Sequence, residues 1–168
     1  MGYPTDSAEW PTTVPSTVVQ LYDLFFSLVD TRSETSGSHL AEEIFTEDGV
    51  FMATSGSFQG HEGTLYMYCF IGMTLIRELA IRACRQGVWK TIISRRHEVR
   101  KVFACDTDGD ILDLILVGAV EVENSDYHKH THEFVVRSVV VHPQSSSPRV
   151  KHYQVLIPAP KTPQTILA

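Results

Sequence analysis

The sequence is poor in cysteine, and this shortage excludes disulfide-rich proteins. Its 168 residues include three cysteines, Cys69, Cys84 and Cys105, and no CxxC pair. An odd and sparse set of cysteines argues against a disulfide framework and predicts buried free thiols in a reducing compartment. We therefore expect a cytoplasmic protein.

Basic residues are also too few and too scattered for a nucleic-acid-binding surface. Lysine and arginine together number 14 against 20 aspartate and glutamate residues, the formal net charge is −6, and no run of Lys or Arg exceeds two residues. Binding to a phosphate backbone requires a basic surface. The composition therefore argues against DNA or RNA as the main partner.

Long apolar runs are missing as well. The stretch TLYMYCFIGMTLI at residues 64–76 is apolar all round, but its 13 residues are fewer than the ~20 that a membrane-spanning helix needs. The N-terminal residues lack the positive and apolar regions of a signal peptide. The myristoylation pattern fails because Asp6 stands where Ser or Thr is required. We expect no membrane partner.

The chain predicts one domain between two short tails. Residues 1–15 carry three prolines and read as a flexible N-terminal arm. Residues 16–160 are long enough for a single hydrophobic core. Residues 161–168 form a C-terminal tail.

Helical patterns come first along the chain. The segment TVVQLYDLFFSLVD has apolar residues at helical spacing and predicts an amphipathic helix with Ser16 as its N-cap. A short helix over HLAEEIF follows, with Ser38 as a candidate cap, and a third helix is expected from Thr74 to Val88.

Strand patterns fill the rest. DGVFMATSGSFQG predicts two short strands around a turn, and four longer strands are expected over TIISRRHEVRKVFACD, ILDLILVGAVEVE, THEFVVRSVVVH and RVKHYQVLI. Gly118, in the middle of a strand, indicates a bulge that bends the sheet. Helices followed by a strand meander predict an α+β fold, with a curved antiparallel sheet packed on about three N-terminal helices.

Several segments resemble fungal SnoaL-like proteins of the NTF2-like superfamily, whose fold is a cone. They are AEEIFTEDGVF…FQGHEG, VWKTIISRRHEVRKVF, LDLILVGAVEV and HYQVLI, and the likeness covers roughly residues 14–158. The resemblance implies a small-molecule substrate in a mostly apolar pocket, no cofactor, and a homodimer formed through the outer sheet face. Residues 64–76 have no counterpart in the similar proteins and are either an added lid or dimer element, or an error in the gene model.

His97, in SRRHEVRKVF, is the first catalytic candidate. The resemblance implies a pocket histidine on this strand, and an imidazole can take or give a proton near neutral pH. Asp30, at the end of the first helix, is the second candidate: the resemblance implies an aspartate at about this place, and a carboxylate can orient a histidine. The alternatives are a histidine bonded only to the backbone and a plain turn residue.

Other arrangements of catalytic residues are possible. The resemblance to scytalone-dehydratase-type enzymes implies a second histidine on the strand after that of His97. That strand carries none here, which argues against scytalone dehydration itself. An epoxide hydrolase of the limonene type needs an Asp–Arg–Asp trio, which Asp113, Arg137 and either Asp30 or Glu133 could supply. Glu133 and Arg137 share one face of their strand. We favour that face pointing outward, because Phe134 on the other face suits a pocket wall.

The segment DYHKHTHEF places His128, His130 and His132 at alternating positions. Alternating histidines share one face of a strand, but a zinc site needs further ligands. We expect an exposed hairpin tip and no native metal, and we keep His132 as a catalytic candidate. The candidates for pocket walls, which could equally be plain core, are Tyr22, Phe25, Phe51, Trp89, Leu116, Gly118, Phe134 and Tyr153.

The leading hypothesis is a cofactor-independent isomerase, cyclase or dehydratase of fungal secondary metabolism. It would act on a polyketide- or terpenoid-like small molecule by general acid–base catalysis, with His97 as base or acid. One alternative is an epoxide hydrolase with two carboxylates and an arginine around one water. Another is a non-catalytic ligand-binding or dimerisation module, because this fold serves many functions.

Overall fold

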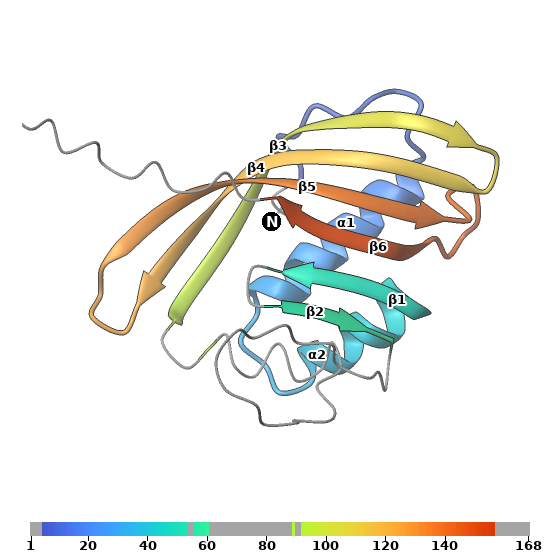
Figure 1. The fold of residues 1–168 in the computed structure, drawn as a ribbon. Helices are drawn as coiled ribbons and strands as arrows, with labels where there is room; N and C mark the ends of the chain where they lie inside the picture. The colour runs from blue at the N-terminus through green and yellow to red at the C-terminus, as the bar shows by residue number, and fades with distance from the viewer. Residues whose placement is uncertain (1–4, 54–55, 61–88, 90–91, 157–168) are drawn as a thin grey trace, which may run out of the picture.

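The computed structural model describes residues 5–53, 56–60, 89 and 92–156 (Figure 1). Residues 64–76, the expected third helix and the tail 161–168 lie outside the described residues. The elements are the helix α1 (Ser16–Asp30), the short helix α2 (Ser36–His39), the π-helical turn η1 (Leu40–Ile44), and the strands β1 (Phe45–Ala53), β2 (Gly56–Gln59), β3 (Ile92–Asp108), β4 (Ile111–Asn124), β5 (Lys129–Val141) and β6 (Arg149–Leu156).

The six strands form one mixed sheet in the order β2-β1-β6-β5-β4-β3. Five of the expected strands are recovered nearly in place, and β1 begins earlier than its pattern predicts. The prediction of an antiparallel sheet is wrong at one position, because β1 and β6 pair in parallel. The chain reaches β3 at the far edge and meanders back through β4 and β5, so β6 arrives beside β1 in the same direction (Figure 1).

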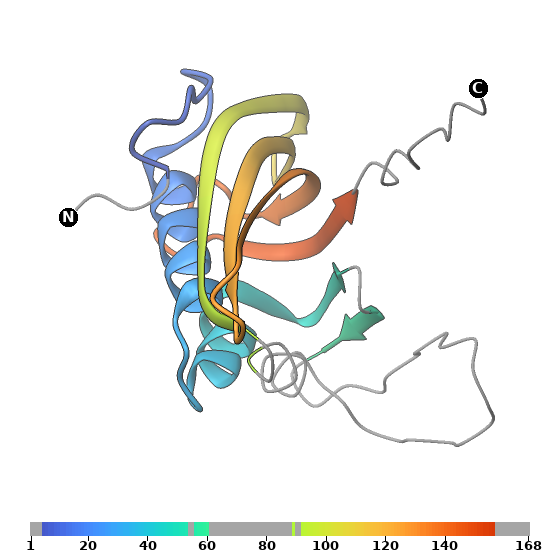
Figure 2. The same cartoon turned by 90° about the vertical axis from the view of Figure 1, so that its left-hand side faces the viewer.

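The sheet curves around α1, which lies against its concave face (Figure 2). The bulge expected at Gly118 is confirmed, but the extra residue lies on the partner strand: β3 shifts register between Val99 and Lys101, opposite Gly118. A Cβ atom on Gly118 would lie 2.2 Å from the Glu98 carbonyl oxygen. The glycine is therefore required by the close approach of β3.

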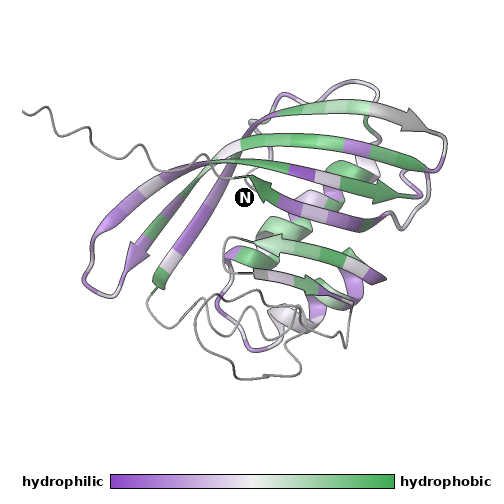
Figure 3. Ribbon diagram, in the orientation of Figure 1, coloured by the Kyte–Doolittle hydropathy of each residue, from purple (hydrophilic) through white to green (hydrophobic). Residues whose placement is uncertain are grey.

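The core lies between α1 and the concave face of the sheet. The predicted amphipathic helix is confirmed, and its buried residues are Val18, Leu21, Tyr22, Phe25, Phe26 and Val29. On β4, Leu112, Leu114 and Leu116 alternate with more exposed residues, as in a strand with one buried face (Figure 3).

Both predicted helix caps are wrong. Ser16 is the first residue of α1, and Pro15 holds the N-cap position with an extended backbone and no side-chain cap. Ser38 lies inside α2, because that helix begins two residues earlier and follows Thr35. Proline fixes its own backbone angle, which suits the start of a helix without any hydroxyl cap.

The N-terminal segment differs from the flexible arm that its prolines predict. Glu9 bridges to β3: its amide donates to the Arg100 carbonyl and its carbonyl accepts from the Val102 amide, each at 3.1 Å. Trp10 packs on Tyr22, with ring centroids 5.9 Å apart. Residues 5–15 are therefore tied to the domain by backbone hydrogen bonds and by an aromatic contact.

The structure also bears on two expectations, one about the cysteine thiols and one about membrane-spanning helices. The free thiol of Cys105 is exposed rather than buried, because it lies on the outer side of β3; Cys69 and Cys84 are outside the described residues. Among the helices that the structure describes, none is long and apolar enough to cross a membrane.

Candidate functional site

Asp30 and His97 form a hydrogen-bonded pair where the end of α1 meets β3. The Nδ1 atom of His97 lies 2.6 Å from Asp30 Oδ1, and the His97 backbone amide donates to Asp30 Oδ2 at 2.7 Å. One carboxylate therefore holds both the ring and the backbone of the same histidine. The two side chains are only 15% and 5% exposed, which shields the pair from water.

The fold brings these residues together from 67 positions apart in the sequence. Asp30 is the last residue of α1, so its side chain leaves the helix toward the concave face of the sheet. His97 lies two residues before the buried Val99 on β3, and alternate residues of a strand share a face. The predicted pairing of a histidine with an orienting aspartate is therefore present in the structure.

Arg95 completes the charged part of the site and was not predicted. Its Nε atom lies 3.4 Å from Asp30 Oδ1, and a guanidinium N–H donates to the Val29 carbonyl at the end of α1. Its guanidinium also lies over the Trp89 ring, 5.8 Å from the centroid. A cation is favourable at a helix C-terminus, because the last carbonyls carry partial negative charge.

Two phenylalanines hold the His97 ring. Phe26 and Phe134 lie with ring centroids 5.2 and 5.5 Å from the imidazole. With Nδ1 engaged by a carboxylate and the ring packed between aromatic groups, Nε2 is the nitrogen that would exchange a proton with a substrate. The arrangement suits general acid–base chemistry.

Of the eight candidate wall residues, three lie at or beside the charged site and five lie in or against the hydrophobic core. Trp89 and Phe134 contact the charged site, through Arg95 and His97 respectively. Gly118 lies under Phe134, whose Cζ atom would be 2.7 Å from an added Cβ. The remaining five belong to the hydrophobic core or pack against it: Tyr22, Phe25, Phe51, Leu116 and Tyr153.

Burial has an electrostatic effect on the two tyrosines of this group. It raises the pKa of Tyr22 and of Tyr153 well above the ordinary value, because a buried phenolate would lose its hydration. Both phenols are therefore neutral over the physiological range and act as aromatic core residues.

Glu133 and Arg137 point to the outer face, as favoured from the sequence. Glu133 is 81% exposed and lies 3.6 Å from Arg100, while Arg137 donates to both oxygens of Asp113 at 2.7–3.2 Å. The aspartate raises the pKa of Arg137, through its hydrogen bonds and its charge. Two carboxylates could complete the epoxide-hydrolase trio with Asp113 and Arg137. Asp30 lies on the concave side and is bonded to His97, whereas Glu133 shares the outer face but has Arg100 as its ion-pair partner. Among the described residues, neither carboxylate forms an ion pair with Arg137.

The three alternating histidines occupy the β4–β5 hairpin end, exposed as expected. Their ring centroids follow one another at 6.4 Å, from His128 to His130 and from His130 to His132. Within the described ranges, no group of three His, Cys, Asp or Glu side chains is placed to hold a metal ion. His132 is not in contact with the Asp30–His97 pair.

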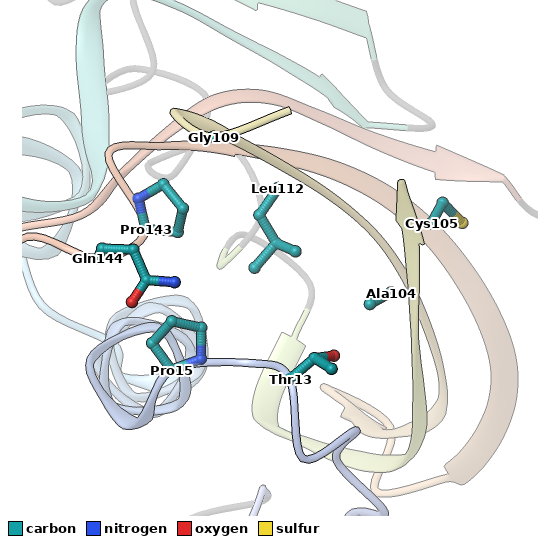
Figure 4. A pocket seen from close by; sticks show the side chains of 8 residues that line it. All are labelled: Thr13, Pro15, Ala104, Cys105, Gly109, Leu112, Pro143 and Gln144. Carbon is teal, nitrogen blue, oxygen red and sulfur yellow. The ribbon is translucent and has the colours of Figure 1, made fainter. Parts of the chain in front are cut away.

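A separate cavity of about 340 Å³ lies at the other end of α1 (Figure 4). It is lined by Thr13, Pro15, Ala104, Cys105, Gly109, Leu112, Pro143 and Gln144. No sequence pattern pointed to it, because its lining comes from four separate segments of the chain.

Comparison with known proteins tests the fold. No protein-family model and no curated protein matches the sequence. An NTF2-like superfamily protein from Salmonella enterica serovar Typhimurium LT2 superposes with a TM-score of 0.59 at 12% identity, over 89% of this chain and 94% of that one. The fold is NTF2-like.

Two other solved structures with this NTF2-like fold are enzymes by name. The hexachlorocyclohexane dehydrochlorinase LinA-type3 from Novosphingobium barchaimii LL02 has a TM-score of 0.62 at 14% identity, covering 84% of both chains. A candidate scytalone dehydratase from Novosphingobium aromaticivorans DSM 12444 has a TM-score of 0.62 at 10% identity, covering 85% of this chain and 83% of that one. At such identities the likeness shows the fold alone.

Proposed function

We propose that this chain is a cofactor-independent enzyme that moves a proton on a small polyketide- or terpenoid-like molecule. The reaction class is isomerisation, cyclisation or dehydration. The observation that carries the proposal is the Asp30–His97 pair, in which one carboxylate accepts hydrogen bonds from the ring and from the backbone amide. The two bonds fix the tautomer and the orientation of the imidazole, as a general acid–base histidine requires.

The chemical step is a proton transfer at carbon. Nε2 of His97 takes a proton from a carbon next to a carbonyl: the C–H bond breaks, an N–H bond forms, and the electron pair moves to the carbonyl oxygen as an enolate. The imidazolium is stabilised by Asp30, and it returns the proton to another atom of the substrate. Low exposure of the pair strengthens this stabilisation, because water screens charge poorly there.

Two further observations support the proposal. Arg95 balances the Asp30 charge without displacing His97, since it approaches the carboxylate at 3.4 Å while His97 lies at 2.6 Å. A dehydrochlorinase and a candidate scytalone dehydratase share the fold, and both names describe eliminations. Membership of the fungal SnoaL-like group, and a role in secondary metabolism, belong to the same proposal and are supported by the sequence resemblance.

The test is deuterium exchange at carbon. The protein is incubated in D2O with 2-tetralone, a bicyclic ketone with acidic α-hydrogens, and the loss of the α-proton signal is followed by NMR. We expect wild-type protein to accelerate exchange and His97→Gln to lose at least ~100-fold of that acceleration, the lower range for general acid–base catalysis.

His142→Gln is the matched control, because this histidine is exposed in the loop after β5. It should exchange at the wild-type rate. Equal exchange by wild type and His97→Gln, or no acceleration by wild type over buffer, would contradict the proposal and favour a non-catalytic binding module.

A further inference from the structure

His132 lies on the same face of the sheet as His97, two strands away. The β3–β4 register pairs His97 with Val120, and the β4–β5 register pairs Val120 with His132. Directly paired residues of antiparallel strands project their side chains to the same side. The three residues therefore form one row across the concave face.

The direction of His132 follows from its neighbours on β5. Phe134, two residues further along, is buried and packs against His97 and Phe26. The β4–β5 register runs from Ile111↔Val141 to Glu123↔Lys129 without a shift, so strict alternation holds between Phe134 and His132. His132 therefore projects to the concave side, beyond the edge of the core, where it is exposed.

The row has a histidine at each end, His97 and His132, and the apolar side chain of Val120 between them. Neighbouring strands are about 4.8 Å apart, which puts the Cα atoms of His97 and His132 roughly 10 Å apart. A hydrogen bond of about 2.8 Å at His132, a proton-transfer contact of about 3 Å at His97 and one six-membered ring between them together span a length of this order. Val120, which is half-buried, lies between the two histidines in the row, and Phe134 is two residues from His132 on β5.

We propose that His132 is the second polar contact of the substrate and binds an oxygen on the opposite side of the ring from the carbonyl group beside which His97 moves a proton. This inference rests on the proposed function and narrows its substrate to a ring with oxygen substituents at opposite positions. An imidazole suits this role, because it can donate to a carbonyl or accept from a hydroxyl. Stacking on His130, at 6.4 Å between centroids and 29° between planes, orients the His132 ring.

The experiment compares two isomeric probes by NMR titration in the absence of oxygen: hydroquinone, with opposite hydroxyls, and catechol, with adjacent ones. Hydroquinone is expected to shift the imidazole signals of both His97 and His132. His132→Gln should weaken hydroquinone binding by roughly 3- to 10-fold, the value of one hydrogen bond, and change catechol binding less than twofold.

His128→Gln is the matched control, since this exposed histidine lies at the turn of the same hairpin, further from His97 than His132 is. It should leave the binding of both probes unchanged. The inference is overturned if His132→Gln leaves hydroquinone binding unchanged, if it weakens both probes equally, or if hydroquinone shifts neither imidazole.

The two proposals fail in different ways. A hydroquinone shift at His97 without one at His132 would remove the inference and leave the acid–base site in place. Loss of acceleration in the deuterium exchange test would remove the acid–base proposal, whatever the hydroquinone probe shows.

Discussion

At the scale of single residues, the site depends on one carboxylate that contacts three groups of two residues. Asp30 accepts from the ring and the backbone of His97 and lies beside Arg95. The resemblance to SnoaL-like proteins pointed to Asp30 and His97, and the sequence pattern placed them at a helix end and on a strand. Arg95 was missed, because its role depends on the helix end that β3 happens to approach.

Asp30→Asn keeps the size of the side chain and removes its charge. Because hydrogen bonds to a charged partner are worth about 1.5–3 kcal/mol, we expect the free energy of unfolding to fall by about that amount. We also expect the strongly hydrogen-bonded Nδ1 proton of His97 to lose its downfield NMR signal. Urea denaturation and proton NMR measure the two effects. An unchanged Nδ1 signal would show that the carboxylate does not hold the ring in solution.

Because the phenol of Tyr22 is buried, we expect the unfolding free energy to fall at alkaline pH. Burial raises its pKa well above the ordinary value, whereas a tyrosine in the unfolded chain ionises near pH 10. The stability from this phenol is therefore fully present below about pH 10 and falls as the pH rises further, by at most about 1.4 kcal/mol per pH unit.

Tyr22→Phe should flatten that decline. We expect the unfolding free energy of the variant to fall less steeply than that of the wild type between pH 9.5 and 11, as measured by urea denaturation at each pH. Tyr127→Phe is the control, because Tyr127 is 76% exposed and should leave the slope unchanged. Parallel slopes for wild type and Tyr22→Phe would contradict the buried, neutral phenol.

At the scale of elements, the register between strands decides which residues meet. Alternation along β5 placed Phe134 and Glu133 on opposite faces, and the suitability of Phe134 for a pocket wall favoured Glu133 pointing outward. The structure agrees, and no bulge interrupts β5 beside β4. The parallel β1–β6 pair was not predictable, because it joins segments about a hundred residues apart. Likewise, the bulge signalled by Gly118 proved to lie in β3, and a glycine does not reveal which strand of a pair carries the extra residue.

Gly118→Ala tests the close approach of β3 to β4 at Gly118. An added Cβ would be 2.2 Å from the Glu98 carbonyl oxygen, which is backbone and cannot move aside without disturbing β3. We expect a loss of about 3 kcal/mol or more in urea denaturation, at the upper end for overpacking.

Gly109→Ala is the comparison for Gly118→Ala. Gly109 has a φ of +43° and open space around it, so only the backbone conformation is strained, at about 1–2 kcal/mol. A smaller loss at Gly118 than at Gly109 would show that β3 and β4 do not approach as described.

At the scale of the whole molecule, the outer face of the sheet exposes several large apolar side chains. Phe103, Ile111 and Leu156 are 46%, 45% and 42% exposed there. The half-buried residues of the same face are Ile115, Val117, Val135 and Val139. Contiguous apolar surface of this kind favours association between proteins.

We propose that two copies of this chain pair through the outer face. Val135→Glu puts a charge in the middle of β5 on that face, so we expect sedimentation analysis to show a dimer for the wild type and a monomer for the variant. Ser145→Glu, in the exposed β5–β6 loop, should remain a dimer. A monomeric wild type would contradict this proposal without affecting the acid–base site.

The central claim is that Asp30 and His97 act as one unit in proton transfer. The measurement that tests it most directly is a double-mutant cycle on the rate of 2-tetralone deuterium exchange, with Asp30→Asn, His97→Gln and the double variant. Residues that act as a unit are strongly non-additive. We expect the double variant to exchange about as slowly as His97→Gln alone. Losses that multiply, or a His97→Gln variant as active as the wild type, would contradict it.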